Sequence, residues 1–230
     1  MNNYSTFVVM LIGFFQSAIG FGQVNGFDPQ GRRDGSWQKY YEGSQQLRYQ
    51  GQFDHGKEVG VFKFYCRDCG SQPTAIREFN AQDQSVRVSY FTKTGQLVAQ
   101  GHLIGQKRDG IWVTFHKNSS EVMSRENYKN GFLEGLKETF YPNGILAESV
   151  IYAKNILEGA QLFYGHNGQL IKSYIYEKGQ LHGPALFYDA AGQLTSEGQY
   201  KRDKKHGLWR YYDQGVLIKE EHYPKPFRPQ

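Results

Sequence analysis

The sequence predicts an all-β fold, an elongated array of about eight antiparallel β-hairpins forming a mostly single-layer, twisted sheet. Aromatic residues make up 16% of the 230 residues, with 27 glycines and only 7 prolines, a composition that suits many short strands and turns. A glycine, a short strand, an aromatic and a turn follow one another in "GLKETFYPNG" from Gly135, and the order recurs from Gly159 and Gly183. This recurrence at a fixed interval is the signature of a repeat protein.

The interval is 24 or 25 residues along the whole array. The expected strand starts are Gly35, Gly60, Ser85, Gly110, Gly135, Gly159, Gly183 and Gly207. Five residues after each start there is an aromatic: Tyr40, Tyr65, Tyr90, Phe115, Phe140, Tyr164, Tyr188 and Tyr212. The returning arm ends in a second aromatic, which we term the closing aromatic: Phe53, Phe79, Tyr128, Tyr152, Tyr176, Tyr200 and Tyr223, with Leu103 as the exception.

Two strands joined by a glycine-containing turn form a hairpin, which is marginally stable alone in water. We therefore expect the hairpins to stack edge to edge and to bury their aromatics against their neighbours. Adjacent strands lie about 4.8 Å apart, so eight hairpins would span roughly 75 Å.

Residues 1–22 differ from the array and predict a secretory signal peptide. The apolar run Phe7–Phe15 is too short to span a bilayer as a helix, and small residues follow it. Cleavage is expected after Gly20 or Gly22, leaving residues 23–230 as one repeat domain. No later segment is apolar enough for a transmembrane helix, so a secreted or periplasmic location in the cell envelope is expected.

The formal net charge of +5 is a mild basic excess. Nucleic-acid-binding proteins usually gather Lys and Arg on one face, whereas the basic residues here are dispersed, so no nucleic-acid partner is expected. The denser run Lys201–Gly207 is either a solvated turn or a contact with an anionic lipid or glycan.

The segments "YKNGFLEGLKETFYPNGIL" (Tyr128–Leu146) and "YEKGQLHGPALFYDAAGQL" (Tyr176–Leu194) resemble the MORN repeat (membrane occupation and recognition nexus). They resemble most closely the bacterial variant labelled YwqK-type antitoxin. The resemblance covers residues 35–223 and is strongest from 110 onward. It implies an antiparallel hairpin array with a binding or scaffolding role and no catalytic residue.

The residues that precede the strand starts vary in type: Asp34, Val59, Gln84, Asp109, Glu134, Glu158, His182 and His206. This variation is typical of a solvated turn and not of a general acid or base, whose identity is fixed. No Cys, His or carboxylate set has metal-ligand spacing. We therefore expect no enzymatic activity, no metal site and no cofactor.

The single irregular motif is "CRDCG", with Cys66 and Cys69, the only two cysteines. It replaces the turn of the second hairpin. A redox pair and half of a zinc site are alternatives, but for an exported protein we expect a short structural disulfide.

A second set of aromatics lies two residues after some starts: Trp37, Phe62, Trp112 and Trp209. Strand alternation places them on the face opposite to the aromatics at the fifth position. They either fill the concave side of the sheet or form an aromatic groove for a peptide, glycan or lipid.

These features predict an exported, non-enzymatic binding or scaffold protein with a protein partner. The alternative is an antitoxin or immunity protein that neutralises a partner toxin.

Overall fold

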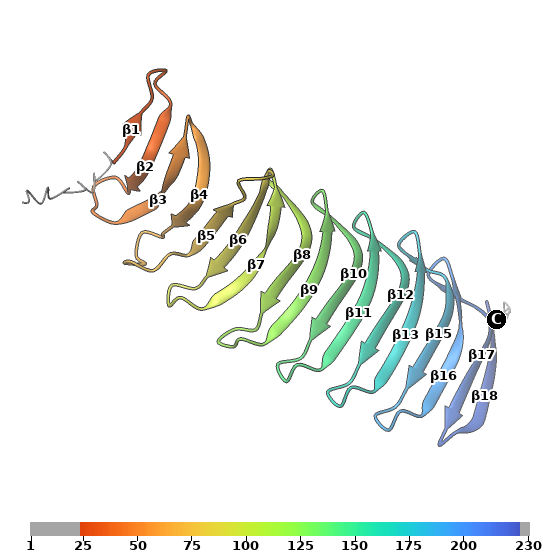
Figure 1. Ribbon diagram of the computed structural model, residues 1–230. Helices are drawn as coiled ribbons and strands as arrows, with labels where there is room; N and C mark the ends of the chain where they lie inside the picture. Colours follow the sequence, from red (N-terminus) through yellow and green to blue (C-terminus); the bar gives the residue numbers. More distant parts are fainter. Residues whose placement is uncertain (1–23, 226–230) are drawn as a thin grey trace, which may run out of the picture.

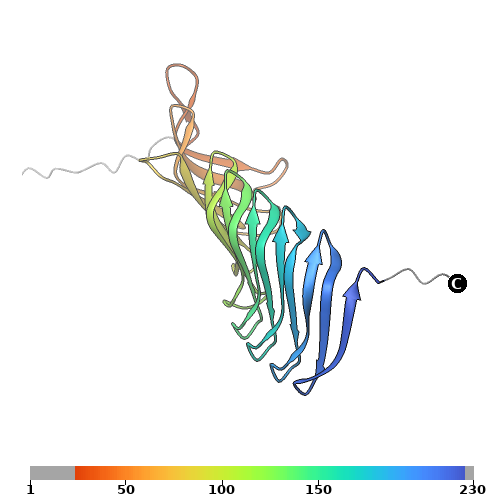
Figure 2. The same cartoon turned by 90° about the vertical axis from the view of Figure 1, so that its right-hand side faces the viewer.

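The computed structural model describes residues 24–225, which form one open sheet of antiparallel strands (Figure 1). Each strand pairs with its neighbours in the sequence, so the chain advances along the sheet without crossing over. The described residues contain no helix, and hence none long and apolar enough to cross a membrane. The predicted all-β, elongated hairpin array is confirmed, and Figure 2 shows its single layer from the side. The expected signal peptide, residues 1–22, lies outside the described residues.

Short strands make up the whole array. The N-terminal half consists of β1 (Gly26–Phe27), β2 (Arg33–Tyr40), β3 (Leu47–Asp54), β4 (Lys57–Phe64), β5 (Ala75–Phe79), β6 (Ser85–Phe91), β7 (Leu97–Ile104), β8 (Lys107–Phe115) and β9 (Val122–Lys129). The C-terminal half consists of β10 (Phe132–Phe140), β11 (Leu146–Ala153), β12 (Ile156–Tyr164), β13 (Leu170–Glu177), β14 (Gln180–Leu181), β15 (Gly183–Tyr188), β16 (Leu194–Lys201), β17 (Lys204–Asp213) and β18 (Val216–Tyr223). We number the hairpins one to eight from β2–β3 to β17–β18; β14 and β15 together form the first arm of hairpin seven.

The opening glycine of each regular hairpin pairs with its closing aromatic. Gly135, for example, is opposite Tyr152, and its φ is +88°. The same strand carries two extra residues against β9, because the pair Leu133–Tyr128 is followed by the pair Lys137–Glu126. Glycine adopts a positive φ at little cost, so it is the residue that lets the strand bend at this bulge.

The third hairpin corrects the predicted register by one residue. Val88 is opposite Gly101 just as Trp37 is opposite Gly51. The position of the opening glycine therefore belongs to Val86, opposite Leu103, and not to Ser85. Glycine and closing aromatic are lost together here, and an aliphatic pair replaces them.

The most buried side chains lie on one face, which we term the inner face. Phe62, Trp112 and Trp209 are 0%, 3% and 1% exposed. Each ring lies over a glycine of the preceding hairpin: a Cβ atom on Gly51, Gly101 or Gly198 would overlap with Phe62, Trp112 or Trp209, respectively. At these three boundaries the inner face is thus packed by fitting a large ring of one hairpin over a missing side chain of the preceding one.

With one exception, the aromatics at the fifth position lie on the outer face, and they are less buried than expected. The exception is Tyr90, because the one-residue shift of hairpin three places it on the inner face opposite Ala99 and gives the outer position to Phe91. Tyr65 is 7% exposed, but Tyr40 is 44% exposed. The hydroxyl of Tyr65 accepts a hydrogen bond from Gln50, and that of Tyr40 donates to Gln38. These rings lie beside the turns, where one neighbouring hairpin covers each of them only in part.

The turns between hairpins stack into a ladder along one rim. The N–H groups of Asn130 and Lys154 donate to the carboxylates of Asp109 (3.0 Å) and Glu134 (2.9 Å). Asp34 and Glu158 have the same role, because they accept hydrogen bonds from the N–H groups of His55 and Lys178. The acidic residues before the opening glycines are therefore turn caps.

The opposite rim is joined by bonds between residues 23 or 24 positions apart. The hydroxyls of Tyr41 and Tyr141 each donate to a carbonyl of the next hairpin, at Tyr65 and Tyr164, both at 2.8 Å. These bonds hold the period of the array at both of its edges.

Each end of the sheet has its own polar cap. Near β1, burial by itself would raise the pKa of Asp28. Hydrogen bonds from the N–H and side chain of Arg32, from His55 and from Gln30 outweigh this effect, so the pKa lies well below its usual range. At β18, hydrogen bonds from Tyr223, Lys219 and Lys225 lower the pKa of Glu221 to about 2.

The ring-over-glycine packing predicts a specific steric cost. We expect Gly198→Ala to lower the free energy of unfolding by about 1–3 kcal/mol, as overpacking of a core does. In a Trp209→Leu background the ring is absent, so the same change should cost little. Urea denaturation of the four proteins of this double-mutant cycle measures the coupling. Additive effects would contradict the packing described here.

The Glu221 cap predicts a pH-dependent contribution to stability. Because the folded pKa of about 2 lies below the ordinary value of 4.5, the contribution is present above pH 4.5 and is lost as the pH falls toward 2. The melting temperatures of the wild type and of Glu221→Gln should therefore differ above pH 4.5 and converge near pH 2. Glu42→Gln, in an exposed turn, is the control. A difference that does not depend on pH would contradict this role.

Candidate binding surface

Three tryptophans of the inner face are each paired with a cation four residues earlier. The guanidinium of Arg33 lies 4.9 Å from the ring centre of Trp37, and that of Arg108 lies 4.4 Å from Trp112. The ammonium of Lys205 lies 3.9 Å from the ring centre of Trp209. Where the tryptophan is absent, in hairpins five to seven, the same position holds a leucine: Leu133, Leu157 and Leu181. The cation thus accompanies the ring and covers it.

The four residues of the expected aromatic groove do not form an open groove. Phe62, Trp112 and Trp209 are buried, as described above, whereas Trp37 is half-buried and donates its indole N–H to the carbonyl of Gly26. Phe62, Trp112 and Trp209 lie in the core of the array because the preceding hairpin has a glycine beneath each ring. A cation from the same strand also covers Trp112 and Trp209. A ligand surface must therefore be sought elsewhere on the inner face.

Hairpins five to seven present a group of tyrosines that we term the tyrosine patch: Tyr152, Tyr174, Tyr176 and Tyr200. All four are half-buried and lie on the inner face, where Tyr174 and Tyr200 contact edge to face at 6.3 Å. Within residues 24–225, none of their hydroxyls makes a hydrogen bond, and no fully buried side-chain polar atom lacks a partner. The four hydroxyls are therefore partly accessible to solvent.

Partial burial of the rings changes their acidity. It raises the pKa of Tyr174, Tyr176 and Tyr200 above the ordinary value of 10.0. The hydroxyls therefore stay protonated at neutral pH, and each can donate as well as accept a hydrogen bond.

Two of the carboxylates that border the tyrosine patch already have partners. The ammonium of Lys137 lies 3.3 Å from a carboxylate oxygen of Glu126, and the side-chain amide of Gln161 donates to Glu148 at 2.6 Å. The patch is thus an aromatic surface with polar tips. This chemistry can bind a protein surface, but it offers no nucleophile and no activated acid or base.

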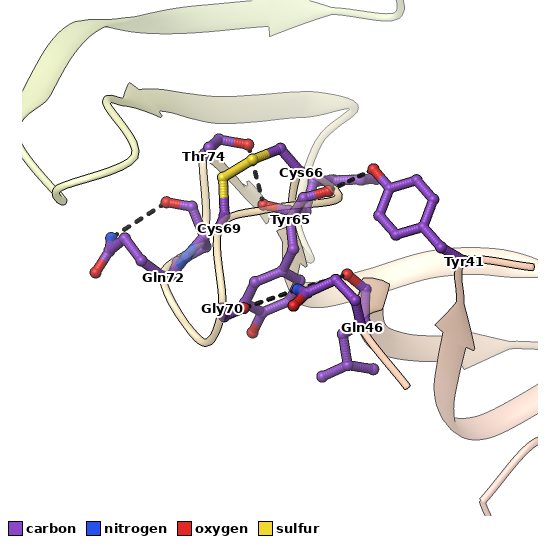
Figure 3. The surroundings of a disulfide bond; sticks show 11 residues. Tyr41, Gln46, Tyr65, Cys66, Cys69, Gly70, Gln72 and Thr74 are labelled. Atoms are coloured by element: carbon purple, nitrogen blue, oxygen red, sulfur yellow. Dashed lines mark hydrogen bonds between the residues drawn. A yellow bond between two sulfur atoms is a disulfide. The ribbon is translucent and has the colours of Figure 1, made fainter. Parts of the chain in front are cut away.

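Cys66 and Cys69 form a disulfide in the turn of hairpin two, with their Cα atoms 5.2 Å apart (Figure 3). The loop remains joined to the neighbouring hairpin at the rim opposite to the ladder of turn caps. The side-chain amide of Gln46 donates to the carbonyl of Gly70 at 2.7 Å, and Tyr41 donates to Tyr65 beside it. The disulfide therefore fixes an altered turn at a regular position of the array.

The stretch Cys66–Ser85, in which the repeat is least regular, contains two separate loops. Strand β5 runs between them, so the disulfide loop and the loop at residues 80–84 lie at opposite rims. They do not form a single surface.

Asp34, Asp54 and His55 bring three potential metal-ligand atoms within 4.8 Å of one another. Two of these side chains already have structural roles, however. Asp34 caps the turn as its equivalents do in other hairpins, and Nδ1 of His55 lies 2.9 Å from the buried carboxylate of Asp28. The cluster is accounted for by the end cap and the rim ladder.

Comparison with protein families identifies two of the hairpins. Residues 133–154 and 181–202 each match the family model described as MORN repeat variant. Each match starts two residues before an opening glycine and ends in the following turn, so it covers one hairpin, the fifth and the seventh. No curated protein matches the chain.

The disulfide loop predicts a modest effect of reduction. Closing a loop of four residues contributes about 2 kcal/mol through the entropy of the unfolded chain. We expect the double variant Cys66→Ser, Cys69→Ser to lose about this much unfolding free energy, and a reductant to lower the stability of the wild type equally. The same reductant should leave the variant unchanged. A wild type that is insensitive to reduction would contradict the prediction.

Proposed function

We propose that this protein is a non-enzymatic binding protein that holds a partner protein on the tyrosine patch of its inner face. The observation that carries the proposal is the group of four half-buried tyrosines with free hydroxyls. Tyrosine offers a large, rigid apolar area and a polar tip, and it is enriched where proteins bind one another. Repeats of the matched family generally bind proteins or membranes and are typically non-catalytic, which supports this class of function.

The array is suited to hold such a surface in a fixed shape. Tyr174 and Tyr176 lie on β13, and Tyr152 and Tyr200 end the flanking hairpins. The rim bonds at both edges fix the distance between these strands. The patch is therefore preorganised, which reduces the entropy lost on binding.

We further propose that the protein is exported and acts in the cell envelope or outside the cell. The apolar run Phe7–Phe15 supports export, and a local disulfide suits an oxidising compartment. An anionic lipid or a glycan is the other class of ligand compatible with an envelope location. The resemblance to the YwqK-type family adds a finer alternative, in which the partner is a toxin.

Removal of hydroxyl groups tests the proposal while leaving the rings in place. We expect Tyr176→Phe combined with Tyr200→Phe to weaken capture of the partner from envelope extract by roughly tenfold or more, since each lost hydrogen bond contributes about 1 kcal/mol. Capture on immobilised protein followed by quantitative mass spectrometry measures the change.

The matched control is Tyr164→Phe combined with Tyr188→Phe, which removes two hydroxyls from the outer face. Equal capture by all three proteins would refute the tyrosine patch as the binding surface. Selective loss of a single tight partner encoded beside this protein would favour the toxin alternative, and loss of binding to vesicles or glycans alone would favour the other ligand classes.

A further inference from the structure

The interruption at hairpin three leaves a hollow on the inner face. A cavity of about 490 Å³ is lined there by Arg77, Tyr90, Leu103, Arg108 and Trp112, together with Gly105 and Gln106. We term it the arginine hollow. It exists because Leu103 is smaller than the closing aromatic of the other hairpins. Its volume lies in the range of about 300–1,000 Å³ that is typical of ligand pockets.

Arg77 has an exceptional position in the array. It occupies the place that is glycine in hairpins one, three and seven, and the residue opposite it on the next hairpin is Val88. The large and the small residue are thus exchanged relative to Gly51 and Phe62. Among residues 24–225, no carboxylate lies within 4.0 Å of the Arg77 guanidinium, which stacks at 5.2 Å on Phe64.

Arg108 adds a second guanidinium that is only partly neutralised. Its Nη1 donates to the hydroxyl of Tyr128 at 3.0 Å and lies 3.8 Å from Glu126, which also pairs with Lys137 at 3.3 Å. The guanidinium of Arg108 and the ammonium of Lys137 therefore share one carboxylate, that of Glu126, while Arg77 has none within 4.0 Å among the described residues. A guanidinium stacked on a ring keeps the N–H groups at its edge available, and their geometry suits a carboxylate.

A second hollow adjoins the first. Its volume is about 460 Å³, and its lining includes Val59, Phe79 and Val86. Both hollows contact Gly105. The first hollow is cationic, whereas the second presents more apolar than polar surface, although its lining also includes Lys57, Glu58 and Asp83. Together they fit an elongated ligand with an acidic group and an apolar group along its length.

We propose that the two hollows form one site for an extended peptide segment of a partner protein. An Asp or Glu side chain would lie between Arg77 and Arg108, and an aliphatic side chain would lie against Phe79 and Val86. The partner's class rests on the proposed function, but the site is separate from the tyrosine patch. A flat phosphate-bearing surface would engage the arginines without filling the apolar hollow, which favours the peptide.

Fluorescence anisotropy with a small peptide set tests the site. The probes are dye-labelled, end-capped alanine peptides that contain one Leu and one Glu separated by none to three alanines. We expect at least one spacing to bind, and replacement of its Glu by Gln, or of its Leu by Ala, to weaken binding at least tenfold. If no Glu peptide binds better than its Gln counterpart, the proposal is wrong, whatever happens to the protein variants.

Arg77→Met removes the charge and keeps the aliphatic volume, and a melting curve verifies its fold. This variant should weaken binding of the Glu peptide at least tenfold and leave binding of the Gln peptide unchanged. Arg125→Met, which removes an outer-face arginine that also stacks on a ring, should change neither. Equal effects of the two variants would overturn the site.

Two further comparisons distinguish this peptide site from a lipid-binding site and from the tyrosine patch. Vesicles containing anionic phospholipid that bind in an Arg77-dependent manner, with no peptide bound, would assign the arginines to a lipid headgroup and overturn the peptide proposal. Tyr176→Phe with Tyr200→Phe should leave peptide binding intact. Failure of the peptide test with capture still lost in that variant would refute this site alone and leave the tyrosine patch supported.

Discussion

A sheet of one layer has no second layer to cover it, so its side chains can be buried only by one another. In this protein, side chains are buried in pairs, and the two members of each pair belong to adjacent hairpins. A ring on one hairpin lies where the preceding hairpin has no side chain, as Trp209 lies over Gly198. The cation over the ring then closes the side that faces solvent. Burial of Phe62, Trp112 and Trp209 on the inner face depends on this contact between neighbours.

The repeat made most of the fold predictable. Glycine at the openings, strands on both arms and an extended single layer all followed from the period and from the inability of one hairpin to bury its apolar residues. The register of hairpin three was wrong because Ser85 preserves an interval of 25 residues. The signal that was missed is that the glycine and the closing aromatic, which pair across the hairpin, are replaced together: Val86 replaces the glycine, and Leu103 replaces the aromatic.

The candidate sites were harder to predict because they depend on contacts between repeats. The expected groove included Phe62, Trp112 and Trp209 on the basis of alternation along one strand. Their burial depends on Gly51, Gly101 and Gly198, which belong to other hairpins and stand in the sequence two residues before the closing residue. The tyrosine patch likewise needs three hairpins side by side. The positions before the strand starts vary in type as predicted, but the capping role of the acidic ones was not foreseen, because Asp and Glu reach the same N–H groups.

The pairwise fit across each boundary has a consequence for how such a chain can evolve. The boundaries differ: Gly51 meets Phe62, Arg77 meets Val88, and Glu126 meets Lys137. Each edge of a hairpin therefore supplies one side of a specific contact, and it fits only the neighbouring hairpin that supplies the other side. Duplicating, deleting or exchanging one unit would bring ring against ring or leave a charge without its counterpart. The repeats are similar in shape but not interchangeable, so the gene can gain or lose whole units only when both new junctions are repaired together.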